Sequence, residues 1–132
     1  MDSRDRQILN YLKENSRMKY VDIAKKMGIS EGCVRQRVSR MVNEGTISRF
    51  TIECSGNEME AIVLIKTKTG ATKSVVEMAK KTSQKIFELS GEYDVAVNIT
   101  AASTDELNEK IDTIRKITGV THTNTLIKLI SH

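Results

Sequence analysis

The stretch Tyr20–Gly45, YVDIAKKMGISEGCVRQRVSRMVNEG, decides the fold of this chain because it predicts two short helices joined by a tight turn. Gly28 interrupts the first helical pattern, and Ser30 is a favourable N-cap for the second helix. Apolar residues recur at helical spacing along the second helix, namely Val34, Val38, Met41 and Val42. Two helices around a glycine-containing turn, with arginines on the second helix, are typical of a helix-turn-helix DNA-binding unit.

The segments on either side of this unit extend it into a small domain. Residues 2–15 predict a preceding helix, and residues 46–52 alternate polar and apolar side chains, which predicts a β-strand. Three helices followed by a strand form a winged-helix arrangement. The polar, glycine-containing segment 53–60 predicts a hinge to a second domain.

The second half of the chain changes to a mixed pattern of strands and helices. We expect strands at 61–67, 86–90, 95–100 and 120–130, helices at 72–85 and after a capping box at 103–106, and a hairpin turn at 91–94. The order βαββαβ predicts a ferredoxin-like domain with four antiparallel strands under two helices. One face of such a sheet is bare, and we expect the chain to dimerise through it. The predicted fold class is therefore α+β, with domains at 1–52 and 61–132 joined by a hinge at 53–60.

Charge is unevenly distributed between the two predicted domains. Residues 1–50 hold 11 Lys and Arg against 6 Asp and Glu, whereas residues 51–132 hold 10 against 11. A basic half beside a neutral half indicates one nucleic-acid face and a second domain with another task. No signal sequence and no apolar run of about 20 residues is found, so we expect a cytoplasmic protein.

Chemistry-bearing residues do not gather into an enzyme or metal motif. Cys33 and Cys54 have no CxxC or Cys/His partners, which favours free thiols, and His122 has no second ligand nearby. No nucleophile, base and orienting group recur together, so we expect neither catalysis nor a metal or cofactor.

With both halves described, the chain resembles the Lrp/AsnC (leucine-responsive, feast/famine) family of archaeal and bacterial transcription regulators. The matching segments are residues 2–9 (DSRDRQIL), 14–17 (ENSR), 22–30 (DIAKKMGIS), 34–47 (VRQRVSRMVNEGTI), 91–94 (GEYD) and 119–125 (GVTHTNT). Two departures stand out. The segment between Ile52 and Ala61 is shorter than the family usually has, and Glu31 replaces the proline that often follows the serine of the second helix.

The predicted recognition helix supplies the candidate DNA contacts. Gln36 has the amide needed to pair with adenine, and an arginine has the fork needed for guanine, although the pattern leaves open which arginine reads a base. Other basic residues are better placed for phosphates. The candidates are Arg17, Lys19, Ser30, Gly32, Cys33, Arg35, Gln36, Arg37, Arg40 and Arg49.

The resemblance also implies an amino-acid pocket between dimers. On the family pattern the effector-binding residues are Gly91, Tyr93, Asp94, Thr123 and Thr125. Backbone N–H groups and threonine hydroxyls suit an α-carboxylate, and an acidic side chain suits an α-ammonium. The alternative is that these are only turn and assembly residues.

The sequence therefore predicts a sequence-specific transcription regulator with a RAM-type effector domain. Its expected partners are a pseudo-palindromic DNA operator, an amino-acid effector and further copies of itself, from a dimer to a tetramer or octamer. Two alternatives stay open at this point: a non-specific architectural DNA-binding protein, and a small-molecule-binding module without a DNA function.

Overall fold

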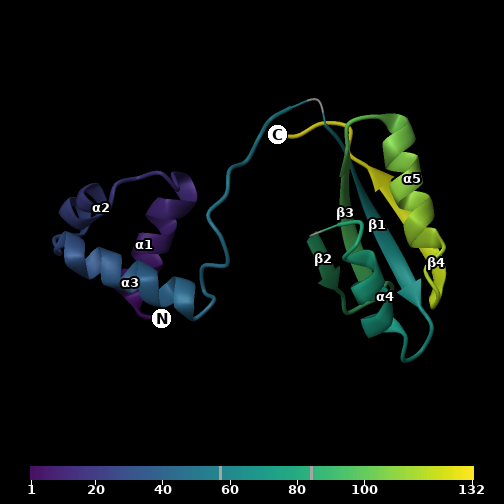
Figure 1. Ribbon diagram of the computed structural model, residues 1–132, viewed down its shortest axis with the longest axis horizontal. Coiled ribbons are helices and arrows are strands. Elements are labelled where there is room, and N and C mark those ends of the chain that lie inside the picture. The colour runs from purple at the N-terminus through teal and green to yellow at the C-terminus, as the bar shows by residue number, and fades with distance from the viewer. Residues whose placement is uncertain (57, 84) are drawn as a thin grey trace. The chain divides into compact units, whose positions relative to one another are not determined.

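The computed structural model describes residues 1–56, 58–83 and 85–132 (Figure 1). Asn57, in the expected hinge, and Gln84, in the expected helix 72–85, lie outside the described residues. The chain forms two compact units, Met1–Ser55 and Gly56–His132. In the described part of the chain, no helix is long and apolar enough to cross a membrane.

The first unit is a bundle of three helices that contains the expected helix-turn-helix. The helices are α1 (Ser3–Glu14), α2 (Tyr20–Met27) and α3 (Glu31–Asn43). Each contributes residues at helical spacing to one buried cluster, as the periodicity predicts. This cluster consists of Ile8, Leu12, Ile23, Ala24, Val34, Val38 and Met41.

The ends of these helices follow local chemistry that the sequence reveals. The Ser30 side chain accepts a 3.1 Å hydrogen bond from the Cys33 backbone N–H and so caps α3. Gly28 ends α2 in the left-handed conformation at φ 68°, and this conformation turns the chain sharply into α3. The helix-turn-helix prediction is thereby confirmed.

The prediction of a β-strand at residues 46–52 is wrong. The described backbone there forms turns and irregular extended structure after α3, anchored by a 3.0 Å hydrogen bond from the Ile47 N–H to the Met41 carbonyl. An alternating pattern makes a strand only when a neighbouring strand satisfies its backbone N–H and C=O groups. The strands of the structure all lie in the second unit, within its one sheet.

The second unit is the expected ferredoxin-like domain. Its elements are β1 (Met59–Thr67), α4 (Thr72–Ala79), β2 (Lys85–Glu88), β3 (Val95–Ala101), α5 (Thr104–Arg115) and β4 (Val120–Ile127). The strands pair in the order β2-β3-β1-β4, and every neighbouring pair is antiparallel. The predicted βαββαβ topology is confirmed.

The two faces of this sheet differ as the sequence predicts. Ala61, Val63 and Ile65 of β1 are buried, and both helices of the unit lie over one face of the sheet (Figure 1). On β1, Ile62 points the other way and remains 46% exposed. The bare face is apolar along three strands, with Ile62, Phe87 and Leu126 among its exposed residues.

Two elements are shorter than predicted. α4 ends at Ala79 instead of reaching residue 85, because the chain turns and the buried Ser83 hydroxyl donates to the carbonyl of Asn98 on β3. The Lys85 N–H donates to the same hydroxyl at 3.1 Å, which sets the start of β2. β4 ends at Ile127 instead of residue 130, and the last hydrogen bond of this edge runs from the Lys128 N–H to the Glu60 carbonyl at 2.9 Å.

The capping box predicted at residues 103–106 forms only in part. The Ser103 side chain accepts a 3.2 Å hydrogen bond from the Glu106 N–H, as expected. The Glu106 carboxylate, however, accepts from the Ala102 N–H at 2.8 Å and not from that of Ser103. These hydrogen bonds and the nearby Lys110 lower the pKa of Glu106.

Candidate DNA-binding face and effector site

The outer face of α3 carries a row of uncharged side chains, and Arg40, which is 47% exposed, lies beside this row. Gly32, Gln36, Ser39 and Asn43 recur at helical spacing on the side of α3 away from its buried residues, and all four are exposed. The structure thus places Gly32 and Gln36 on the outer face that the sequence predicts. Asn43 was missed by the sequence reasoning, although its position seven residues after Gln36 puts it on the same face.

Arg35 lies on one flank of this face. Its guanidinium pairs with the Glu31 carboxylate at 2.6 Å, one helical turn away, and stacks over the Tyr20 ring at 5.4 Å from the centroid. Glu31 and Arg35 are both exposed, so this pair contributes at most about 1 kcal/mol to stability. Arg35 therefore keeps the freedom to leave Glu31 for another anion.

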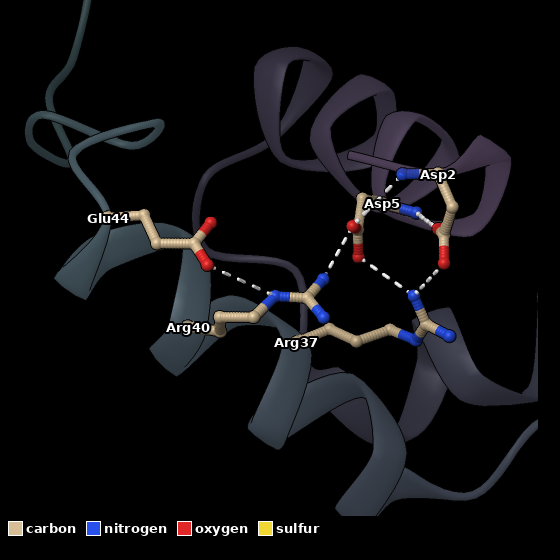
Figure 2. A network of polar contacts seen from close by, with 5 residues as sticks. All are labelled: Asp2, Asp5, Arg37, Arg40 and Glu44. Carbon is tan, nitrogen blue, oxygen red and sulfur yellow. Dashed lines mark hydrogen bonds and ion pairs between the residues drawn. The ribbon is translucent and has the colours of Figure 1, made fainter.

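The other flank carries a network of ion pairs between α3 and the start of α1 (Figure 2). Arg37 Nη1 lies 3.0 Å from Asp5 Oδ1 and 2.7 Å from Asp2 Oδ2. Arg40 Nη2 lies 2.5 Å from Asp5 Oδ2, and Arg40 Nε lies 3.9 Å from Glu44. Asp5 is only 1% exposed, whereas Arg37 is 19% and Arg40 47% exposed.

These contacts fix the charge state of the network. Hydrogen bonds from Arg37 lower the pKa of Asp2 to about 2. Burial is the largest single influence on Asp5 and raises its pKa, but the hydrogen bond from Arg37, the hydrogen bond with Asp2 and the charge of Arg40 together lower the pKa below its ordinary value. Hydrogen bonding with Asp2, Cys33 and Asp5 raises the pKa of Arg37 above its already high value. Asp2, Asp5 and Arg37 are therefore charged at neutral pH.

The remaining candidate DNA contacts have distinct local surroundings. The Ser30 hydroxyl is occupied as the N-cap of α3, and Lys19 accepts the first backbone hydrogen bonds of α2 at its carbonyl while its side chain is exposed. Arg17 and Arg49 come from different segments and line one groove of about 630 Å³ within the first unit. The structure therefore brings Arg17 together with Arg49 but separates both from the uncharged face of α3.

The first part of the candidate effector site is the turn that precedes β3. Asp94 Oδ2 accepts hydrogen bonds from the Thr67 N–H at 2.8 Å and from the Thr67 hydroxyl at 3.2 Å. The Asp94 N–H donates to the Ile65 carbonyl at 2.9 Å, and Gly91 has a φ of 143°, a conformation open to glycine. Asp94 thus ties its turn to the end of β1. Thr67 is a partner that the sequence reasoning did not identify.

The second part of the site lies on the other side of β1. Thr123 and Thr125 of β4 are paired with Ile65 and Val63, whereas Asp94 precedes the strand on the opposite side. Neighbouring strands lie roughly 5 Å apart, so one copy of the chain keeps the two parts about 10 Å from each other. The Thr125 hydroxyl is buried and has no hydrogen-bond partner among the described residues.

Family models match both units of the chain. Residues 1–48 match the family described as winged helix-turn-helix DNA-binding, and residues 60–131 match the Lrp/AsnC ligand binding domain. Together the matches cover almost the whole chain.

Individual relatives agree with these matches. The HTH-type transcriptional regulator LysM of Saccharolobus solfataricus is 36% identical, over 98% of this chain and 94% of that protein. The solved structure of AsnC from E. coli is similar at 26% identity and a TM-score of 0.78, covering 99% of this chain and 93% of that one. A Neisseria meningitidis regulator solved as a complex with L-Met shares the fold at 18% identity and a TM-score of 0.79, covering 100% of this chain and 93% of that one.

Proposed function

The chain belongs to the Lrp/AsnC family of transcriptional regulators, and we propose that it binds a specific DNA operator and that an amino acid controls this binding. The observation that carries the proposal is the exposed row of uncharged residues on α3, with Arg35 on one side of the row and Arg37 and Arg40 on the other. Residues 1–52 then form the DNA-binding domain, residues 53–60 the hinge and residues 61–132 the effector domain. Relatives named as transcriptional regulators support a role that is not enzymatic.

In this proposal α3 enters the major groove of DNA. Gln36 reads adenine through its amide, and the small side of the helix at Gly32 and Cys33 lets the backbone approach the bases. Arg17, Lys19 and Arg49 supply phosphate contacts, which give affinity without sequence choice.

The bare face of the sheet supports self-association. An apolar surface along three strands is costly in water, and a second copy of the same sheet removes both surfaces from solvent. A two-fold dimer presents two α3 helices, which fits a pseudo-palindromic operator with half-sites about one helical turn apart or a multiple of it. Dimers assemble further into tetramers or octamers in the cytoplasm.

The effector site follows from the separation of its two parts. One copy holds Asp94 and Thr123 on opposite sides of β1, so a ligand that touches both kinds of group bridges copies of the chain. An amino acid bound between dimers then favours one arrangement of the DNA-binding domains over another, and operator affinity changes by linkage. The L-Met complex of a protein with the same fold supports an amino acid as the ligand class.

DNA binding is tested by measuring salt-dependent affinity for a fragment of the protein's own promoter and for random-sequence DNA of the same length. We expect tighter binding to the promoter at every salt concentration. Equal affinity for the two would leave a non-specific architectural protein, and no binding to either would leave a small-molecule-binding module.

The effector is tested by screening the amino acids for a shift in melting temperature. Asp94→Ala should abolish the shift that the wild type shows. Thr67→Val is the matched control, because it removes one hydrogen bond to Asp94 but keeps the carboxylate and the bond from the Thr67 N–H. A shift that survives in Asp94→Ala would place the amino acid elsewhere.

A further inference from the structure

Asp5 is a buried carboxylate that the DNA-binding proposal does not use. It lies in the first turn of α1, and its two partners on α3 are 32 and 35 residues further along the chain. Asp5 Oδ1 faces Arg37 at 3.0 Å and Asp5 Oδ2 faces Arg40 at 2.5 Å, so one carboxylate engages both guanidinium groups. One carboxylate can reach both guanidinium groups because Arg37 and Arg40 lie about one helical turn apart on α3.

We propose that Asp5 is a positioning residue for DNA recognition, which holds Arg37 and Arg40 against α1 and withholds their charge from DNA phosphates. The side chains that read bases then come from the uncharged row that includes Gln36, Ser39 and Asn43. This inference rests on the proposed binding of α3 to DNA.

The geometry divides the arginines of α3 into two kinds. Arg35 forms an ion pair with the exposed carboxylate of Glu31, one turn away on its own helix, and this pair breaks at little cost. Arg37 contacts both Asp2 and Asp5 and is mostly buried. A phosphate that drew Arg37 away would leave the buried Asp5 charge with one partner fewer, which costs far more than separating an exposed pair.

The paired arginines affect selectivity rather than affinity alone, and Figure 2 shows the carboxylates that face them. Asp2 and Asp5 balance the charges of Arg37 and Arg40, and Glu44 approaches Arg40 from the next turn of α3. Phosphates occur at every position of every DNA sequence, so two released arginines would strengthen binding to all sequences alike. Keeping them paired leaves a larger share of the binding free energy to base contacts.

The test compares Asp5→Asn with wild type in binding to the promoter fragment and to random-sequence DNA, over a range of salt concentrations. Asn keeps the shape of Asp but not the charge. We expect tighter binding to random DNA, a smaller ratio of promoter to random affinity, and a salt dependence steeper by about 0.9 for each arginine that engages a phosphate.

Three further variants separate this effect from general charge and from folding. Glu109→Gln removes the same charge from an exposed side chain of α5 in the other unit and should leave the salt slope and the affinity ratio close to wild type. Asp5→Asn with Arg37→Gln should return the salt slope toward wild type, because one released charge is gone. Asp2→Asn frees one contact of Arg37 from an exposed site and should give a smaller change in the same direction, and it decides the matter if Asp5→Asn does not fold.

The outcomes distinguish the two proposals. If the wild type binds neither the promoter fragment nor random-sequence DNA, both the DNA function and this inference are overturned. If the wild type prefers its promoter and folded Asp5→Asn matches Glu109→Gln in salt slope and affinity ratio, the role of Asp5 alone is overturned.

Discussion

Gly119→Ala is expected to destabilise the effector domain more than an ordinary glycine substitution in a turn. Gly119 follows α5 and begins the motif that leads into β4, and its backbone has a φ of 101°. A Cβ atom at this position would lie 2.9 Å from the Ala71 Cβ and 3.2 Å from the Val75 Cγ2. Both neighbours are short side chains that cannot move aside, since Ala71 and Val75 are held by the start of α4.

Three terms set the magnitude of the loss in stability. A positive φ costs a residue with a Cβ roughly 1–2 kcal/mol. Forcing an extra methyl group into a packed site typically adds about 1–3 kcal/mol. Alanine also lowers the conformational entropy of the unfolded chain, which offsets about 0.4–1 kcal/mol of this loss in stability. The net loss for Gly119→Ala is therefore about 2–4 kcal/mol.

Gly70→Ala is the matched control for the backbone part. Gly70 has a φ of 82°, and a Cβ atom built on it meets no atom within 4 Å. Its substitution should cost only about 1 kcal/mol, because the backbone term and the gain from the unfolded chain remain while the crowding term is absent.

Hydrogen exchange of the backbone amides measures this difference within the effector domain. Amides of β1 should lose about 2–4 kcal/mol of opening free energy in Gly119→Ala, whereas amides of α3 in the other unit should be unchanged. Equal losses for Gly119→Ala and Gly70→Ala would refute the reasoning, because the crowding around Gly119 would then have no energetic effect.

Three more predictions concern the two units separately. Because the folded pKa of Asp2 is about 2 against an ordinary 3.8, its stabilising effect is present above about pH 4 and is lost as the pH falls to 2. The free energy of unfolding, measured through α3 amides, should therefore fall between about pH 4 and pH 2 in the wild type. Asp2→Asn should remove this part of the pH dependence. Ser103→Ala removes the cap of α5 and should cost the effector domain about 1 kcal/mol in urea unfolding, with Thr104→Ala as the neighbouring control. Ile114→Ala opens a cavity in the core and should cost about 2–5 kcal/mol, whereas Ile62→Ala on the bare face should mainly weaken self-association in analytical ultracentrifugation.

Local signals were sufficient for most of the elements. Helices α1 to α3 and the βαββαβ order follow from apolar periodicity and from caps such as Ser30 and Gly28, which act within a few residues of the chain. The strand expected at 46–52 was wrong because alternation describes only one side of a hydrogen-bonded pair. The early end of α4 depends on Ser83 reaching Asn98 on another strand, which no local pattern contains.

The candidate sites divide in the same way. Helical spacing alone puts Gln36 on the outer face of α3 and would have added Asn43. The sequence could not reveal that Asp94 is held by Thr67, because these residues are 27 positions apart and meet only when β3 pairs with β1. The assignments to DNA and to an amino acid stay predictions.

The sequence was enough to predict the helix-turn-helix, the βαββαβ order and the family, because these depend on spacing and motif order along the chain. The use of the charges on α3 became visible only in the folded protein. Composition counts Arg37 and Arg40 as positive charge available to DNA, whereas packing of α1 on α3 places both against the buried Asp5. The sequence gives the number of charges on α3, but only the packing of α1 on α3 determines which carboxylates pair with them.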